Sequence, residues 1–408
     1  MLARLWPPNS KAAQNIAWGV WLIALVVIAV RGELAPASNS VIPCYFEAGH
    51  HWVAGEDLYQ RCRDTCRYSP FMHAVLAPLC VAPSWLGPLL WRGLNAGIFL
   101  LGMRRWLFAV CPMEWSESAR AAVLVLTLPL ALGSVNNGQA NVLMVGAMLW
   151  ASAAAAEGRW WPTAAGITIA TLLKVYPLAF GLILIAAFPR RLGWRLPLCL
   201  AVGLAAPFLI QPIAYVARQY PRWLANLLED DRTRLALQYG YRDLWQLIRA
   251  ARLPIDHQLY VVLQVALACC LGITCAALGL YGLPRRRLAW HALGMGAVWM
   301  TLCGPATESC TYILLAPVLP AVGLDCWRRR EPPWVLVTLV LAAAALWSSV
   351  VITGIGWGKP LLNYGLQPAG ALLLFVVVLR EAWAEPALTR QRNPFQQGVS
   401  PRPLEAAA

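Results

Sequence analysis

Charged residues are scarce in this sequence. Only 13% of its 408 residues are Asp, Glu, Lys or Arg, whereas soluble globular domains contain about 25%. Hydrophobic residues make up 59% of the chain. Apolar runs of about 17 to 25 residues, long enough to cross a bilayer as a helix, recur along most of the length. The alternating polarity of a membrane β-strand is not seen. We therefore predict an all-α integral membrane protein.

Several familiar functional patterns are also missing. The twelve cysteines do not have the spacing of a metal site, so no cofactor is expected, and a divalent cation is neither indicated nor excluded. Cys62 and Cys66, in a polar loop, could form a disulfide or remain free thiols. No glycine-rich nucleotide loop is present. The net charge of +14 is divided among short connectors, which argues against nucleic-acid binding.

Twelve predicted spans follow from the positions at which polar residues, glycines and prolines interrupt the apolar runs. They lie near residues 16–30, 70–83, 88–106, 119–135, 138–156, 162–188, 196–215, 259–283, 288–303, 309–325, 334–354 and 361–379. The basic connectors 190–195, 285–287 and 328–330 fall on one side together with both termini, and the positive-inside rule makes that side cytoplasmic. Arg104 and Arg105 disagree, because the same count places them outside.

Two connectors, residues 31–69 and 216–258, are longer than a turn requires and come out on the external side. The second interleaves leucines with arginines, which is typical of a segment lying flat on the membrane interface. We predict a single polytopic membrane domain over residues 1–383. A cytoplasmic tail over residues 384–408, rich in Pro, Arg and Gln, is predicted to be disordered.

The first long loop concentrates polar and aromatic residues just outside the membrane. It contains the carboxylates Glu47, Glu56, Asp57 and Asp64, and it ends with Arg67-Tyr68-Ser69-Pro70. Aromatic rings and carboxylates suit a sugar, and arginines suit a phosphate. The alternative interpretation is a solvated loop with interfacial aromatic residues.

Polar residues also interrupt two apolar segments. The turn Asn136-Asn137-Gly138-Gln139-Ala140-Asn141 has four amides, of which helix capping explains one or two. Lys174 lies within the span 162–188, where a cation costs about 2.5 to 3.5 kcal/mol at the helix centre. No carboxylate is near it in the sequence, so its partner is a ligand phosphate, which we favour, or a group on another helix. Pro177 indicates a kinked or broken helix.

Together these segments resemble the polyprenol-phosphate-sugar-dependent membrane glycosyltransferases of the GT-C fold, and most closely the mannosyltransferases of glycosyltransferase family 87. The matching elements are Glu47-Ala48 with Gly55 and Leu58-Tyr59, then Arg67-Tyr68-Ser69-Pro70, Asn137-Gly138-Gln139-Ala140-Asn141, and Lys174 with Tyr176-Pro177. Their order and spacing agree with the family over about residues 40–190. After Gly240 the likeness is only hydropathic.

The resemblance implies a GT-C fold, which our count of about 12 transmembrane helices and two large external loops fits. It implies inverting transfer of a sugar, typically mannose, from a polyprenyl-monophosphate donor to a lipid or glycan hydroxyl. The implied partners are that donor, that acceptor and the lipid bilayer, with no nucleic acid. The implied location is the bacterial inner membrane, with the active site on the external face. The candidate substrate-binding residues are Asp57, Tyr59, Arg67, Tyr68, Asn137, Gln139, Asn141, Lys174 and Tyr176.

One departure from the family concerns the catalytic base. The family places an aspartate about four residues before the aromatic that matches Tyr45, and this sequence has Asn39, Ser40 and Val41 there. Either a nearby carboxylate has taken over, with Glu47 favoured over Glu33, or the chain is a non-catalytic relative. The rival from another class is a secondary transporter or lipid flippase, which the absence of an internal repeat and the long external loops disfavour.

Overall fold

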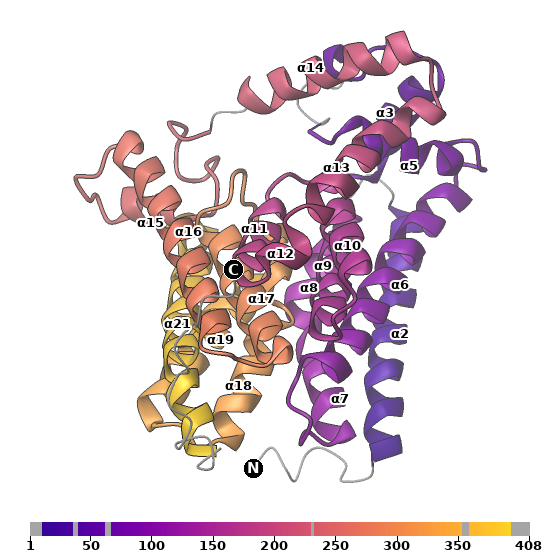
Figure 1. Ribbon diagram of the computed structural model, residues 1–408. Helices are drawn as coiled ribbons and strands as arrows, with labels where there is room; N and C mark the ends of the chain where they lie inside the picture. Colours follow the sequence, from indigo (N-terminus) through magenta and orange to yellow (C-terminus); the bar gives the residue numbers. More distant parts are fainter. Residues whose placement is uncertain (1–9, 36–39, 62–66, 230–231, 353–358, 393–408) are drawn as a thin grey trace, which may run out of the picture.

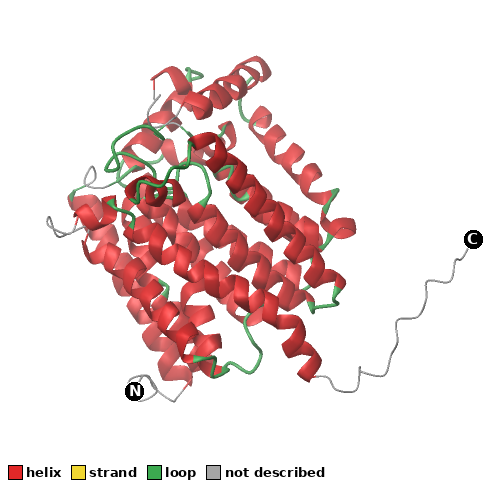
Figure 2. Cartoon of the chain, turned by 90° about the vertical axis from the view of Figure 1, so that its left-hand side faces the viewer, coloured by secondary structure: helices red, strands yellow, loops and turns green. Residues whose placement is uncertain are grey.

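The computed structural model describes residues 10–35, 40–61, 67–229, 232–352 and 359–392, which form helices and loops with no strand among them (Figure 2). The helices are α2 (Ser10–Leu34), α3 (Ile42–Val53), α4 (Leu58–Arg61), α5 (Pro70–Cys80), α6 (Leu86–Ala109), α7 (Glu117–Leu126), α8 (Leu128–Asn137), α9 (Asn141–Ala156), α10 (Trp160–Leu173), α11 (Leu178–Ala187), α12 (Pro189–Leu192), α13 (Arg195–Ala205), η1 (Ala206–Leu209), α14 (Ile213–Glu229), α15 (Leu244–Ala250), α16 (His257–Leu280), α17 (Arg285–Leu302), η2 (Ser309–Leu315), α18 (Val318–Arg328), α19 (Pro333–Ile352), α20 (Lys359–Asn363) and α21 (Leu366–Arg392).

The described helices confirm an all-helical membrane protein. Six helical segments are long and apolar enough to cross a bilayer, and α7 with α8, bent by 48°, makes a seventh if the pair is one span. The shorter apolar helices include α5, α9 and α11. The predicted number of twelve spans is therefore not confirmed by length and composition alone.

The bundle has two different ends (Figure 1). The short helices α3, α5, α14 and α15 gather at one end, which we call the loop end. The opposite end, which we call the basic end, holds the connectors with Arg285–Arg287 and Arg328–Arg330. Its parts are joined by contacts, since the Arg286 side chain donates to the Val110 and Phe108 carbonyl oxygens and Arg328 donates to that of Glu114.

Arg105 also lies at the basic end, where it forms an ion pair with Glu157. The conflict over Arg104 and Arg105 arose because residues 70–83 were predicted to be a span. In the structure this segment is α5, whose 11 residues cover about 16 Å and cannot cross a hydrocarbon layer of about 30 Å. It packs beside α3 at the loop end instead, with Cys80 close against Gly49. Removing that crossing brings the Arg104-Arg105 connector to the same end as the others.

Residues 162–188 do not form one span either. The chain breaks between α10 and α11, at Lys174 to Pro177, and reverses direction. The Trp160 ring, at the start of α10, lies 4.9 Å from the Phe188 ring, which follows the end of α11. The two helices therefore form an antiparallel hairpin, with Lys174 at its tip.

The predicted tail begins inside a helix. α21 continues to Arg392, so residues 384–392 of that tail are helical, and residues 393–408 lie outside the described residues. The helix extends because Glu385 is buried and forms an ion pair with Arg287 of α17 at 2.6 Å. A buried ion pair between two helices holds α21 against the bundle at this point.

Candidate functional site

Three tyrosines from the first long loop form a buried cluster at the loop end. The hydroxyl groups of Tyr45, on α3, and Tyr68 hydrogen-bond to each other, and their rings pack edge to face at 4.9 Å. Tyr59, on α4, donates its hydroxyl hydrogen to the Tyr68 carbonyl oxygen at 2.8 Å. These contacts fix the loop against the bundle rather than leaving it solvated.

The amide-rich turn joins α8 to α9 beneath this cluster. Gly138 adopts the left-handed conformation, with φ of 73°, that ends α8, and a Cβ there would meet the Ile42 side chain at 2.5 Å. Asn141, the first residue of α9, donates to the Gln139 side-chain oxygen at 2.6 Å and accepts from the Tyr176 hydroxyl at 3.4 Å. The Ala140 backbone N–H faces the Tyr45 hydroxyl at 3.5 Å. The amide-rich turn therefore contacts both the α10–α11 hairpin, through Tyr176, and the first long loop, through Tyr45.

Lys174 is half-buried at the tip of the α10–α11 hairpin, beside two tyrosines. Its ammonium group lies 5.8 Å from the centre of the Tyr68 ring and 5.9 Å from that of Tyr176. Such distances are typical of cation–π contacts. Among the residues that the structure describes, Lys174 has no ion-pair partner within 4.0 Å. The charge of Glu308 acts on it from a longer distance, and that of Arg67 opposes it.

Glu308 belongs to the second half of the chain, where it caps the N-terminus of η2. Its side chain accepts from the Thr311 backbone N–H, and its own N–H donates to the Thr311 hydroxyl at 3.1 Å. Arg232 lies 3.6 Å from one carboxylate oxygen. The element is fixed to α8 because Ser134 donates its hydroxyl hydrogen to the Cys310 carbonyl oxygen at 2.5 Å. Glu308 is thus held beside the amide-rich turn.

The structure places the other predicted site residues around the edge of this cluster. Asp57 forms an ion pair with Arg222 of α14 and accepts from the Tyr59 backbone N–H at 3.0 Å, so it ties the loop to α14. The Arg67 carbonyl oxygen accepts from the Trp223 indole at 3.2 Å. Asn137, the last residue of α8, accepts through its carbonyl oxygen from the Val41 N–H at 3.0 Å.

Glu47 is not brought to the cluster. It is exposed on α3, whereas Tyr45, two residues earlier on the helix, is buried. Residues two apart on a helix point in nearly opposite directions. The catalytic role of Glu47 stays a prediction. Asp64 lies outside the described residues, as do Cys62 and Cys66, for which a disulfide and free thiols were the two alternatives.

One histidine lies directly behind the tyrosines. His73, on α5, is 2% exposed, and the Tyr59 ring meets it edge to face at 6.4 Å. Burial lowers the pKa of His73 to about 4. The imidazole is therefore neutral at neutral pH and adds no third cation beside Lys174 and Arg67.

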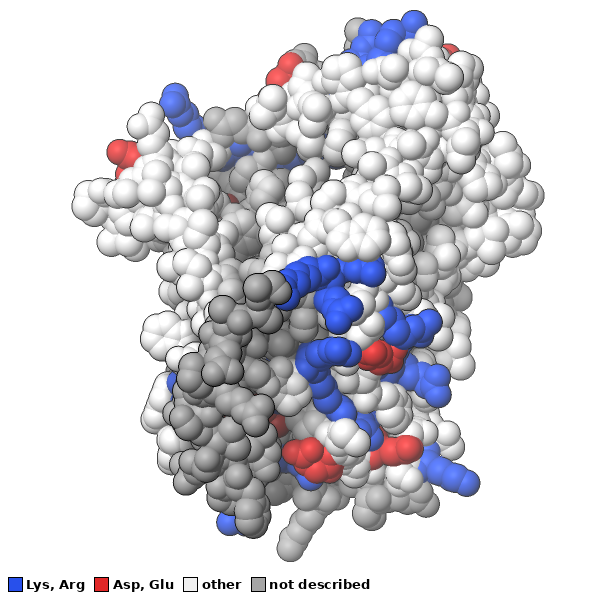
Figure 3. Space-filling model, viewed as in Figure 1, with Lys and Arg blue, Asp and Glu red and all other residues white. Residues whose placement is uncertain are grey.

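The molecular surface is hollowed at the loop end, between the part that carries α15 and the part that carries α14 (Figure 3). Lys or Arg side chains are visible inside this hollow. On the lower part of the same face, basic side chains gather towards the basic end (Figure 3). Cations therefore occur both in the hollow and at the end that we expect to be cytoplasmic.

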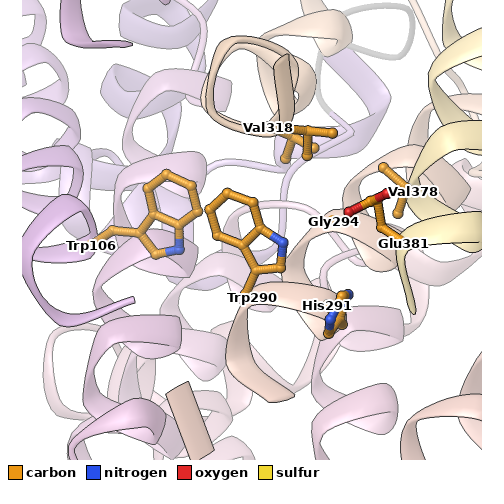
Figure 4. A pocket seen from close by; sticks show the side chains of 8 residues that line it. Trp106, Trp290, His291, Gly294, Val318, Val378 and Glu381 are labelled. Atoms are coloured by element: carbon orange, nitrogen blue, oxygen red, sulfur yellow. The ribbon is translucent and has the colours of Figure 1, made fainter. Parts of the chain in front are cut away.

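A second polar group lies inside the bundle towards the basic end. A pocket there is lined by Trp106, Trp290, His291 and Glu381 (Figure 4), and the two indoles stack at 5.7 Å. The neighbouring ion pairs join Arg287 to Asp325 and Glu385 and join Arg329 to Asp325 and Glu381. These residues link α17, α18 and α21, and none of them belongs to the tyrosine cluster.

The family model of glycosyltransferase family 87 matches residues 67–305, more than half of the chain. The chain belongs to glycosyltransferase family 87. This finding confirms that it is a glycosyltransferase. The match extends well beyond residues 40–190, over which the sequence motifs resembled the family, and it includes the region after Gly240.

Two further comparisons accompany this match. No curated protein matches the chain. Among solved structures, ArnT from Cupriavidus metallidurans, crystallised with undecaprenyl phosphate, is similar at 16% identity and a TM-score of 0.44, over 97% of this chain and 82% of that one.

Sequence reasoning missed two charged residues of the polar cluster at the loop end, Glu308 and Arg232. Glu308 is the only Asp, Glu, Lys or Arg between Arg287 and Asp325. The argument that singled out Lys174, a lone charge in an apolar segment, could have found it. Arg232 carried no comparable signal, because it is one of several arginines in the second long connector.

Proposed function

We propose that this family 87 glycosyltransferase transfers mannose from a polyprenyl-monophosphate donor to a hydroxyl of a lipid or glycan, with inversion at the anomeric carbon. The observation that carries the proposal is the position of Lys174. It is a half-buried cation without a close ion-pair partner among the described residues, and it lies beside the rings of Tyr68 and Tyr176 at the loop end.

A phosphate would suit this position. Desolvating an ammonium group is costly unless an anion compensates for it, and a donor phosphate brings that anion to the cluster. The edges of tyrosine and amide side chains offer donors and acceptors for sugar hydroxyl groups. Once the donor is bound, Lys174 would stabilise the charge that develops on the departing phosphate.

We further propose that the loop end faces the outside of the bacterial inner membrane. Support comes from the basic connectors with Arg105, Arg285–Arg287 and Arg328–Arg330, which lie at the opposite end. By the positive-inside rule that opposite end is cytoplasmic. Donor and acceptor would then meet in the external leaflet, where α14 lies across the end of the bundle (Figure 1).

Sugar transfer by the purified full-length protein tests the proposal. We expect radiolabelled mannosyl-phosphoryl-undecaprenol to donate mannose to an extract of bacterial membrane lipids, and GDP-mannose not to do so. Glucosyl-phosphoryl-undecaprenol, which differs from the first donor only in its sugar, is the matched comparison. Faster transfer of glucose than of mannose would contradict the assignment of mannose. Binding of the donor without any transfer would identify a non-catalytic relative.

A further inference from the structure

We propose that Glu308 is the carboxylate that accepts the proton of the acceptor hydroxyl. This inference rests on the proposed function and assigns a residue of the second half of the chain to its central step. It would fill the role left open by Asn39, Ser40 and Val41, which stand where the family has its aspartate.

Glu308 is held at the loop end by its place in the fold. It caps η2, which is joined to α8 by the hydrogen bond from Ser134 to the Cys310 carbonyl oxygen. Its charge acts on Lys174, on the two tyrosines beside that cation, Tyr68 and Tyr176, and on Tyr45. Its own backbone is fixed by the reciprocal capping bonds with Thr311. A base has to be held in place to be effective, and this carboxylate is held at the start of η2.

The Glu308 carboxylate is accessible. Its side chain is 42% exposed, so an incoming hydroxyl can reach it. The ion pair with Arg232, at 3.6 Å, is longer than a direct charge-assisted hydrogen bond of about 2.8 Å. The carboxylate therefore retains accepting capacity for a hydroxyl donor.

The other carboxylates of the loop end are paired or lie apart from the cation. The Glu56 carboxylate lies 2.7 Å from the His51 ring nitrogen, and Asp57 is paired with Arg222. Glu33 and Glu47 are exposed, and neither charge acts on Lys174. Among the carboxylates that the structure describes, Glu308 alone combines an accessible side chain with a charge that acts on Lys174.

The acceptor oxygen forms a bond to the anomeric carbon while the bond from that carbon to the phosphate oxygen breaks, and its electron pair leaves with the polyprenyl phosphate. The hydroxyl proton passes to Glu308, which later releases it to solvent. Lys174 stabilises the departing phosphate and Arg232 holds the carboxylate, so the two cations have separate tasks.

Glu308→Gln tests the inference against Glu47→Gln, the sequence-based candidate, with Glu114→Gln at the basic end as the matched control. The amide keeps an oxygen that can accept from the Thr311 N–H, so η2 stays capped, but the base is lost. Transfer of mannose should fall at least about 100-fold for Glu308→Gln, as for loss of a general base. Transfer should stay near the parent rate for Glu114→Gln. A loss of that size for Glu47→Gln, with transfer by Glu308→Gln near the parent rate, would overturn the inference.

Binding of undecaprenyl phosphate supplies a second readout that does not depend on the identity of the sugar. Removing a negative charge near the phosphate site should leave binding unchanged or make it tighter, because like charges repel. Weaker binding by Glu308→Gln, with a lowered thermal midpoint, would show that Glu308 only organises Lys174 and Arg232. If the parent binds undecaprenyl phosphate but transfers no sugar from any donor, the proposed function is contradicted. Retained or tighter binding by Glu308→Gln would then show only that Glu308 lies beside the phosphate site.

Discussion

The hydroxyl group of Tyr45 is hydrogen-bonded to that of Tyr68, although one residue lies on α3 and the other directly before α5. The pair joins α3 to the C-terminal end of the first long loop. Tyr68 also accepts, through its carbonyl oxygen, from Tyr59. The tyrosine cluster therefore fixes the first long loop and also lines the proposed site.

Tyr68→Phe should weaken both roles. Loss of a buried hydrogen bond costs about 1 to 3 kcal/mol, so the thermal midpoint should fall. Sugar transfer should fall by about tenfold if the hydroxyl also contacts the donor. Tyr239→Phe, at a tyrosine that is 63% exposed, is the control and should change neither measurement. The same thermal midpoint and the same transfer rate in both variants would contradict a role for the Tyr45–Tyr68 hydrogen bond.

Lys174→Met should weaken binding of the lipid-linked donor by about 10- to 100-fold, because one charge-assisted contact to the phosphate is lost. Tryptophan fluorescence titrated with undecaprenyl phosphate measures the affinity. Lys11→Met, on α2 and distant in the sequence from Lys174, is the matched control. A large loss of thermal stability without ligand, with unchanged affinity, would show instead that Lys174 serves as a structural partner of Glu308.

Asp243→Asn should stabilise the protein at neutral pH. Asp243 is buried at the N-cap of α15, where it accepts from the Gln246 N–H at 3.2 Å, and burial raises its pKa to about 6. The folded state therefore binds a proton more tightly than the unfolded state, so stability falls as pH rises from about 4 to about 6. Asparagine caps equally well without the charge.

The expected gain for Asp243→Asn is up to about 3 kcal/mol at pH 7.5 and almost nothing at pH 4. Thermal unfolding in detergent at both values measures it. Asp256→Asn is the control, because Asp256 caps α16 in the same way, accepting from the Leu259 N–H at 2.7 Å, but is exposed. A gain that does not depend on pH would contradict the burial argument.

Gly102→Ala should destabilise the contact between α6 and α9. A Cβ on Gly102 would overlap the Gly146 carbonyl oxygen, and one on Gly146 would lie 2.6 Å from that of Ile98. Both are backbone atoms, so the helices have to separate, at a cost of about 1 to 3 kcal/mol. Gly97→Ala, on the same helix with open space around it, should be neutral or stabilising by up to about 1 kcal/mol.

The orientation of the bundle can be measured by labelling single cysteines in a cysteine-free variant. Leu235, which is 45% exposed, marks the loop end, and Trp327, which is 64% exposed, marks the basic end. A membrane-impermeant maleimide should label Leu235→Cys in cells with a permeabilised outer membrane. It should label Trp327→Cys only after the inner membrane is opened. The reverse pattern would invert the proposed topology.

The sequence was most informative about polar residues that stand in apolar segments, where polar groups are normally absent. Lys174 and the amides around Gly138 are polar groups in apolar surroundings, and the structure brings them together. The same rule should have found Glu308, but the family likeness stopped earlier in the chain. Reversal of direction after Lys174 could not be predicted, because a proline break fixes where a helix ends and not where the next one goes. α5 was misjudged because its apolar character, without its length, was taken as a span.

The α10–α11 hairpin also constrains how the protein is made. At 1.5 Å per residue its two helices are about 21 and 15 Å long, so neither can enter a bilayer of about 30 Å as an independent span. The pair has to be inserted as one unit, with Lys174 carried across at the tip. Glu308, the carboxylate whose charge acts on Lys174, is synthesised much later, so the nascent chain holds this cation without that nearby negative charge until the last third emerges. Biogenesis should therefore pass through an intermediate that is stabilised by lipid phosphates or by a chaperone in the membrane.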